Sequence, residues 1–355
     1  MTALDARAEG HTALIGPVMM DLAGLSLSES ERCTLQDPRI GGVILFSRNF
    51  SDRAQLCALV ESLRAARAAP LLIAVDHEGG RVQRFRTGFS QLPSMAALGL
   101  LYARRPAAAV EAAEDCGMVL AHELLACGLD FSFAPVLDVD FGRSTVIGNR
   151  AFSPDPEVIS LLAGALVRGL ERAGSAGIGK HFPGHGHVSA DSHTDLPIDE
   201  RTLAELEAAD LKPFRALARE LRGIMPAHVV YRACDDQPAG FSKFWLQDVL
   251  RCGLGFEGAI FSDDLAMAGA LGAGTPADRA RAAFAAGCDM VLLCNDPVAL
   301  LALLADLGEP AVPLGAGARL ARLRARLNGA GAAARDCDAA RRRLDELALP
   351  GWSAA

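Results

Sequence analysis

Short apolar segments alternate with helical patterns along most of the chain, and this alternation restricts the possible folds more than any other feature. The candidate strands are residues 13–20, 42–46, 71–75, 129–136, a segment ending at Ile178, 223–225, 259–261 and 290–294. The predicted helices are residues 28–36, 51–68, 107–127, 155–173, 199–221, 242–252, 275–286 and a further one from Asp296. Strands that alternate with helices pair in parallel through crossover helices, so we expect an α/β protein.

Polar residues cluster directly after these strands, at residues 76–84, 138–150, 180–193, 228 and 263–264. In a (β/α)8 barrel the carboxyl ends of the strands form the catalytic mouth, whereas an open sheet concentrates its site at one switch point. The distribution therefore predicts a (β/α)8 TIM-type barrel. We expect a single catalytic domain over residues 1–355, in which the part from about residue 310 is a helical tail laid against the outside.

Several predicted helices begin with a recognisable cap. Ser51 and Ser242 are candidate N-cap residues, because a serine side chain can accept a hydrogen bond from a free amide of the first turn. Thr275 and Asp296 are each followed by proline, which is favoured at the first helical position.

Composition and charge exclude several classes of protein. Of the 355 residues, 51% are hydrophobic and 22% are charged, which suits a large folded core. The formal net charge is −8 and no basic stripe is visible, so neither nucleic acid nor an anionic membrane is an expected partner. Apolar runs stay well short of the ~18 residues of a membrane span, and the N-terminus lacks a secretory signal pattern.

The nine cysteines are spread singly and no Cys-x-x-Cys pattern occurs. Their odd number argues against a disulfide framework, and we expect reduced thiols in a cytoplasmic protein. The sequence does not determine the oligomeric state, although we favour a monomer.

The densest polar cluster is Lys180 to His193, which holds four of the eight histidines within fourteen residues. A solvated loop with incidental histidines is one interpretation. A metal site is another, since His185 and His187 resemble a chelating pair. Lys180 would bring a positive charge close to any cation, however, so we expect catalysis without a metal.

Asp263 is the candidate nucleophile, because a carboxylate at a strand end can attack a sugar carbon and form a covalent glycosyl intermediate. Its neighbour Asp264 is expected to point away from the mouth, to cap or brace, and we interpret it as a helix N-cap. Asp191 and His193 form a candidate acid/base pair, since histidine can donate a proton in one step and accept one in the next.

Five further polar residues at strand ends are candidate binding groups for hydroxyls or an acyl oxygen: Asp76, Arg84, Arg150, Lys180 and His181. Other polar residues are assigned to structure. His122 and Glu123 are interpreted as packing positions of a helix, and Asp138 and Asp140 as supports of the mouth. His228 is either a site wall or a packing residue.

Six motifs in one order over residues 13–300 resemble the family 3 glycoside hydrolases, and among them the single-domain bacterial β-N-acetylhexosaminidases of cell-wall recycling. They are AVDHEGGRVQR (74–84), FAPVLD (133–138), IGNR (147–150), KHFPGHG (180–186), DSH (191–193) and FSDDL (261–265). One departure is His77, where this pattern has glutamine.

The resemblance implies a retaining mechanism on a (β/α)8 barrel, with no metal or other cofactor. It also implies that Asp263 is the nucleophile and His193 the acid/base with Asp191 as its partner, and that the five binding residues contact the substrate. The implied substrate is a small glycan, an anhydro-muropeptide fragment from which a cytoplasmic enzyme releases N-acetylglucosamine.

Two alternatives stay open. A metal-dependent amidohydrolase could use the histidine cluster and Asp263 on the same barrel, in which case a chelator would abolish activity. The second alternative is a barrel that binds a sugar without catalysis, and a turnover assay distinguishes it from an enzyme.

Overall fold

The computed structural model describes residues 15–189, 196–325 and 330–355. Its centre is a sheet of eight parallel strands in the order β6-β3-β2-β1-β12-β11-β9-β7. In chain order the strands are β1 (Val18–Met20), β2 (Ile40–Leu45), β3 (Leu72–Val75), β6 (Phe131–Ser132), β7 (Ile178–Phe182), β9 (Gly223–Pro226), β11 (Ala259–Asp264) and β12 (Met290–Leu292). Seven of the predicted strands overlap the observed ones, whereas the segment expected to end at Ile178 is displaced, because β7 begins at Ile178 and includes Lys180 and His181.

The sheet curls into a nearly closed barrel, because the chain that follows β6 continues alongside β7. A parallel bridge joins Val136 to Lys180. The Ile178 amide donates to Ala134 at 2.7 Å, and the Leu137 amide donates to Lys180 at 2.6 Å. The prediction of a (β/α)8 barrel over an open sheet is therefore confirmed.

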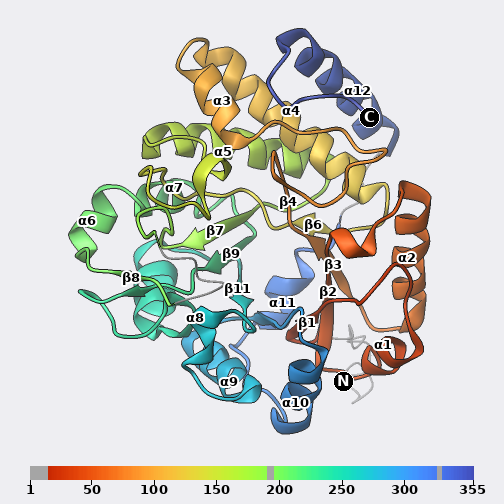
Figure 1. The fold of residues 1–355 in the computed structure, drawn as a ribbon, viewed down its shortest axis with the longest axis vertical. Helices are drawn as coiled ribbons and strands as arrows, with labels where there is room; N and C mark the ends of the chain where they lie inside the picture. Colours follow the sequence, from red (N-terminus) through yellow and green to blue (C-terminus); the bar gives the residue numbers. More distant parts are fainter. Residues whose placement is uncertain (1–14, 190–195, 326–329) are drawn as a thin grey trace, which may run out of the picture.

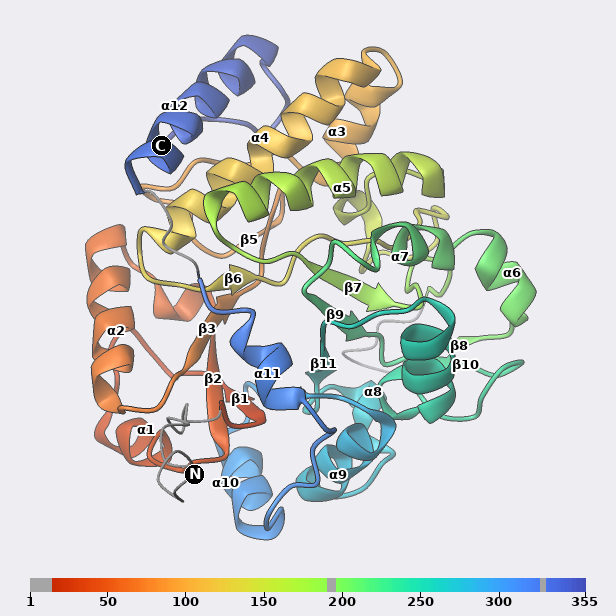
Figure 2. The same ribbon diagram turned by 180° about the vertical axis from the view of Figure 1, so that it is seen from behind.

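Helices surround the barrel (Figures 1 and 2). They are α1 (Glu29–Thr34), α2 (Arg53–Ala66), α3 (Met95–Tyr102), α4 (Pro106–Leu125), α5 (Pro156–Ala173), α6 (Leu203–Ala208), α7 (Leu211–Leu217), η4 (Phe244–Gly253), α8 (Ala268–Leu271), α9 (Pro276–Ala286), α10 (Pro297–Asp306), α11 (Ala316–Ala321) and α12 (Ala330–Leu347). Two short pairs of strands lie outside the barrel: β4 (His77–Gly79) with β5 (Val82–Gln83), and β8 (Ile198–Asp199) with β10 (Val230–Tyr231).

Apolar side chains fill the inside of the barrel. Phe131, Phe133 and Phe261 form its centre. The Phe133 ring contacts the other two rings edge to face, with centroid distances of 5.3 and 5.2 Å. Leu320 and Leu323 of the α11 region pack into the same cluster. The helix α11 therefore covers the amino-terminal end of the barrel, and the opposite end is left for the polar residues.

The single helix expected over residues 199–221 is wrong. Asp199 belongs to β8, and the chain then forms two helices, α6 and α7, that break at Ala209 (φ −134°, ψ −80°). Pro213 gives the reason, because a proline ring clashes with the carbonyl four residues earlier. Thr202 caps α6 with a reciprocal bond to Glu205, which sets the true start.

The cap expected at Ser51 is displaced by one residue. Asp52 is the N-cap of α2 and accepts from the Gln55 amide at 2.9 Å. The Ser51 hydroxyl instead donates, to Asp52 Oδ2 at 3.0 Å and to Gln55 Oε1 at 3.4 Å. The expected roles of Thr275 and Asp296 are confirmed by hydrogen bonds to the third helical residue of α9 and α10. Ser242 accepts from the Trp245 amide at 3.1 Å, as a capping side chain does.

Candidate active site

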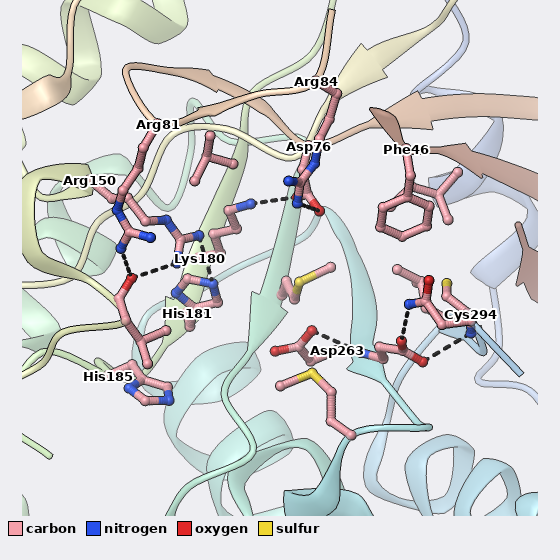
Figure 3. A pocket seen from close by; sticks show the side chains of 18 of the residues that line it. Phe46, Asp76, Arg81, Arg84, Arg150, Lys180, His181, His185, Asp263 and Cys294 are labelled. Atoms are coloured by element: carbon pink, nitrogen blue, oxygen red, sulfur yellow. Dashed lines mark hydrogen bonds and ion pairs between the residues drawn. The ribbon is translucent and has the colours of Figure 1, made fainter. Parts of the chain in front are cut away.

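A cavity of about 440 Å³ opens at the carboxyl ends of the barrel strands (Figure 3). All six described residues of the predicted site line it: Asp76, Arg84, Arg150, Lys180, His181 and Asp263. They come from four different strands and the loops after them, as expected for a barrel mouth. The other two predicted residues, Asp191 and His193, lie outside the described residues.

Lys180 is buried on β7 with its ammonium group between two carboxylates. Its Nζ lies 2.8 Å from Asp76 Oδ1 and 2.6 Å from Glu78 Oε1. A lysine is rarely buried unless it is paired, since removing its charge from water is costly. The two carboxylates hold the ammonium group at the cavity wall, where it can also donate to a ligand oxygen (Figure 3).

Glu78 is a member of the site that sequence analysis missed. Arg150 donates to it from two nitrogens, Nε at 2.8 Å and Nη2 at 2.7 Å, so one buried carboxylate joins Arg150 to Lys180. Burial alone would raise the pKa of Glu78, but Arg150 and Lys180 outweigh it and hold that pKa well below the ordinary value. The spacing could have identified it, because Asp76 and Glu78 are two residues apart and alternate side chains of an extended chain share a face.

Replacing Glu78 by glutamine should cost on the order of 3 to 5 kcal/mol of unfolding free energy, because Arg150 loses its paired carboxylate and Lys180 keeps only that of Asp76. Substrate affinity should fall as well, since both cations line the cavity. Urea unfolding and KM measure the two effects. The control is Glu200→Gln, which breaks an exposed pair with Arg232 and should change stability by less than about 1 kcal/mol. Equal losses in both variants would contradict the buried-pair account.

His181 is oriented by Asp138, which is completely buried. The ring Nδ1 lies 2.7 Å from Asp138 Oδ2, and the His185 amide donates to Asp138 Oδ1 at 2.6 Å. Burial would raise the pKa of Asp138, but His181 and these hydrogen bonds outweigh it and lower the pKa. With Nδ1 donating to Asp138, Nε2 of His181 is directed to the cavity side, where Arg150 lies at 3.5 Å. The interpretation of Asp138 as a support is thereby confirmed.

Asp263 lies across the cavity from the Asp76–Lys180 pair (Figure 3). Its Oδ1 accepts a hydrogen bond from the Asp264 amide at 2.8 Å, which fixes the carboxylate at the end of β11. The side chain is partly exposed to the cavity, so it is accessible to a bound molecule.

Asp264 does not cap a helix, because the N-cap of α8 is Met267. Its Oδ1 instead accepts from the amides of Ala266 and Cys294, both at 3.0 Å, which joins the ends of β11 and β12. The helix cap expected of Asp264 is therefore wrong, and this residue braces the strand end instead. Burial raises the pKa of Asp264 to about 6.

The remaining histidines separate into cavity and packing positions. His185 lines the cavity, whereas His187 lies 3.0 Å from Arg143 and faces a different recess near Asp199. His228 is buried, stacks on Phe241 and contacts the Asp264 carbonyl, so it is a packing residue. Among residues 15–189, 196–325 and 330–355, no three His, Cys, Asp or Glu side chains are grouped as a metal site.

His77 does not line the cavity. It is buried beside the rings of Phe85 and Phe89, with centroid distances of 5.7 and 5.9 Å. Burial, with the positive charges of Arg86 and Arg84, lowers its pKa to about 3. The imidazole is therefore neutral in the folded protein, and the departure at this position changes the packing behind the site.

The low pKa of His77 should make the protein sensitive to acid. Unfolded chains protonate histidine below pH ~6.5, whereas folded His77 resists protonation until about pH 3. Stability is therefore fully present above pH ~6.5 and falls as the pH decreases, by up to ~1.4 kcal/mol per pH unit from this group. Urea unfolding of wild type and His77→Gln at pH 5 to 8 should give parallel curves above pH 7 and a shallower decline for the variant below pH 6. Identical slopes below pH 6 would show that His77 is not the cause.

A barrel mouth with a carboxylate opposite a cluster of charged side chains is typical of enzymes that act on polar small molecules, and glycoside hydrolases are one such class. Comparison with known proteins gives the family. The sequence model of the glycosyl hydrolase family 3 N terminal domain matches residues 15–313. The chain belongs to glycosyl hydrolase family 3, and the expected class of enzyme is confirmed.

The chain is 56% identical over 310 residues to the Beta-hexosaminidase of Thiobacillus denitrificans, with 87% of this chain and 86% of that protein covered. Among solved structures it resembles NagZ from Neisseria gonorrhoeae in complex with N-trifluoroacetyl-D-glucosamine, with a TM-score of 0.88, 48% identity and coverage of 94% and 98% of the two chains. A further structure of that NagZ, in complex with zinc ion, matches with a TM-score of 0.87, 46% identity and coverage of 94% and 98%.

Proposed function

We propose that the protein is a retaining β-N-acetylhexosaminidase that releases terminal non-reducing N-acetylglucosamine from peptidoglycan fragments. The observation that carries the proposal is the placement of the Asp263 carboxylate opposite the Asp76–Lys180 pair in one cavity. The names of the relatives support it, as does the N-trifluoroacetyl-D-glucosamine bound to the similar NagZ.

The charged side of the cavity is suited to the hydroxyls of one sugar ring. A carboxylate such as Asp76 accepts hydrogen bonds from sugar hydroxyls, and the Lys180 ammonium and Arg150 guanidinium donate to their oxygens. His181 presents Nε2 as an additional partner, and Arg84 reaches the same cavity from the β5 end. These five residues are proposed to hold the sugar with its anomeric carbon toward Asp263.

In the first chemical step, Asp263 attacks the anomeric carbon while the bond from that carbon to the aglycone oxygen breaks. Protonated His193 gives its proton to the departing oxygen, so a glycosyl ester of Asp263 and a free aglycone result. In the second step a water molecule attacks the same carbon and gives its proton to His193, which releases N-acetylglucosamine and restores the Asp263 carboxylate. Asp191 is proposed to orient His193 in both steps.

The proposed reaction uses no metal or other cofactor, since the nucleophile and the proton donor are both side chains. A cytoplasmic location agrees with nine cysteines that are all free thiols. No described helix is long and apolar enough to cross a membrane. A single domain acting as a monomer stays a prediction, which light scattering with size-exclusion chromatography tests.

A panel of chromogenic β-glycosides tests the proposal. The N-acetylglucosaminide should be hydrolysed much faster than the glucoside or xyloside, and anhydro-muropeptides should release N-acetylglucosamine. Activity should survive a chelator and should not require added zinc. Loss of activity with the chelator and its return with zinc would favour the metal-dependent alternative instead.

A further inference from the structure

The C-terminal segment contacts a loop that directly follows Arg84, one of the proposed substrate-binding residues. Ser353 pairs antiparallel with Gln91: the Gln91 amide donates to the Ser353 carbonyl at 2.7 Å, and the Ser353 amide donates back at 3.0 Å. The Ala355 amide also donates to Ser90 Oγ at 3.2 Å. We propose that the C-terminal segment, residues 334–355, positions Arg84 for sugar binding by fixing the neighbouring loop 85–92.

This segment lies beyond residue 313, where the family match ends. Its helix α12 packs along α4 on the outside of the barrel (Figures 1 and 2). The proposal rests on the proposed function in one respect, which is that Arg84 contacts the sugar.

A buried carboxylate provides a second connection between the segment and the loop. Glu123 on α4 is 2% exposed and accepts from Ser90 Oγ at 2.6 Å and from the Ser90 amide at 3.0 Å. Arg341 on α12 donates to the same carboxylate at 2.6 Å. A buried carboxylate needs a counter-charge, and Arg341 supplies it to the same carboxylate that accepts from Ser90.

The loop in turn determines where β5 lies. Gln83, buried on β5, donates to the Ser90 carbonyl at 2.8 Å and accepts from the Leu92 amide at 2.9 Å. The Gly80 amide donates to the Leu92 carbonyl at 3.0 Å, which ties the turn between β4 and β5 to the same place. A shift of residues 90–92 would therefore move Gln83 and, with it, the adjacent Arg84.

Arg84 depends on this support more than the other cations of the cavity do. Lys180 and Arg150 are held by ion pairs of 2.6 to 2.8 Å, whereas the guanidinium of Arg84 lies 3.8 Å from Asp76. Its buried Nε has no hydrogen-bond partner within the part of the chain that the structure describes. The Phe46 ring, at 5.9 Å from Arg84 Cζ to the ring centroid, is another neighbour of this guanidinium. Because these contacts are long, the position of the guanidinium depends mainly on the backbone of Arg84, which the C-terminal segment supports.

Ser353→Pro tests the inference in the full-length enzyme, because proline removes the amide that donates to Gln91. The matched control is Ala354→Pro, whose amide makes no hydrogen bond among the described residues. We expect Ser353→Pro to raise KM for the chromogenic N-acetylglucosaminide about fivefold, the factor that one lost hydrogen bond corresponds to, with kcat within about twofold. Hydrogen exchange of residues 85–92 should accelerate, and the control should match wild type in both measurements.

A second variant, Ser90→Ala, removes the hydroxyl that joins Glu123 to Ala355 and should raise KM in the same way. In an Arg84→Ala background, Ser353→Pro should have no further effect on KM, because the residue that it positions is gone. A merely stabilising role would lower the melting temperature without this dependence on Arg84.

The inference is overturned if Ser353→Pro and Ser90→Ala leave KM unchanged in an active enzyme, or if the rise in KM persists without Arg84. Wild-type protein that hydrolyses no β-N-acetylglucosaminide would instead overturn the proposed function and the role of Arg84 with it. The two failures are thus distinguished by the activity of the wild-type enzyme.

Discussion

Replacing Asp263 by asparagine should lower kcat on the order of 10⁵-fold, as removal of a catalytic nucleophile does in other enzymes that form covalent intermediates. The fold should persist, because asparagine is nearly the same size and keeps the oxygen that accepts the Asp264 amide. The measurements are kcat with a chromogenic N-acetylglucosaminide and a thermal melt. Asp236→Asn, at an exposed carboxylate, is the control and should retain wild-type kcat.

Covalent labelling locates the nucleophile independently of the rate. An activated fluorosugar should form a stable ester with Asp263, visible as a mass increase in the intact protein and assigned by peptide mapping. Asp264 should stay unlabelled, since its carboxylate is turned toward the Ala266 and Cys294 amides. A label on Asp264, or no label at all, would exclude Asp263 as the nucleophile.

Replacing His193 by alanine should lower the rate by about 10²- to 10⁴-fold on substrates with poor leaving groups, which is the usual contribution of a general acid. Activated aryl glycosides should lose far less, because their leaving groups depart with little help from a proton. A leaving-group series on wild type and His193→Ala measures the difference. His187→Ala is a control from the same motif, since His187 contacts Arg143 and does not line the cavity.

Asp191→Ala should reproduce part of the His193→Ala effect and shift the acid side of the pH–rate profile, because Asp191 is proposed to orient His193. Losses that are equal across the leaving-group series would show that His193 is not the proton donor. His181 and His185 would then be the candidates, since both line the cavity with Asp263.

The positions of six site residues were predictable from the sequence. Asp76, Arg84, Arg150, Lys180, His181 and Asp263 were predicted from their positions after strands, and the structure places all of them at one cavity. Their catalytic and binding roles stay proposals until the variants are measured. The positions of such residues are predictable because the carboxyl ends of all the parallel strands of a barrel lie at the same end of it, whatever sequence connects the strands.

The sequence by itself determined the barrel and the end of it that carries the site. Continuous apolar segments such as β2 indicate strands buried on both faces, and caps such as Thr275 mark helix starts, because both signals depend on neighbouring residues alone. Pro213 is a local signal of the same kind, and it explains why α6 and α7 are separate helices where one helix is expected over 199–221.

Only the tertiary structure decided which charges pair and which distant segments meet. Glu78 joins Arg150 to Lys180, Asp138 orients His181, and Ser353 pairs with Gln91. The partners in these pairs lie between 43 (Asp138 and His181) and 262 (353 − 91) residues apart along the chain. A local pattern cannot specify such pairs, because each residue type has many possible partners along the chain. The choice is made when folding buries the groups, since a buried charge or amide is stable only beside a complementary partner.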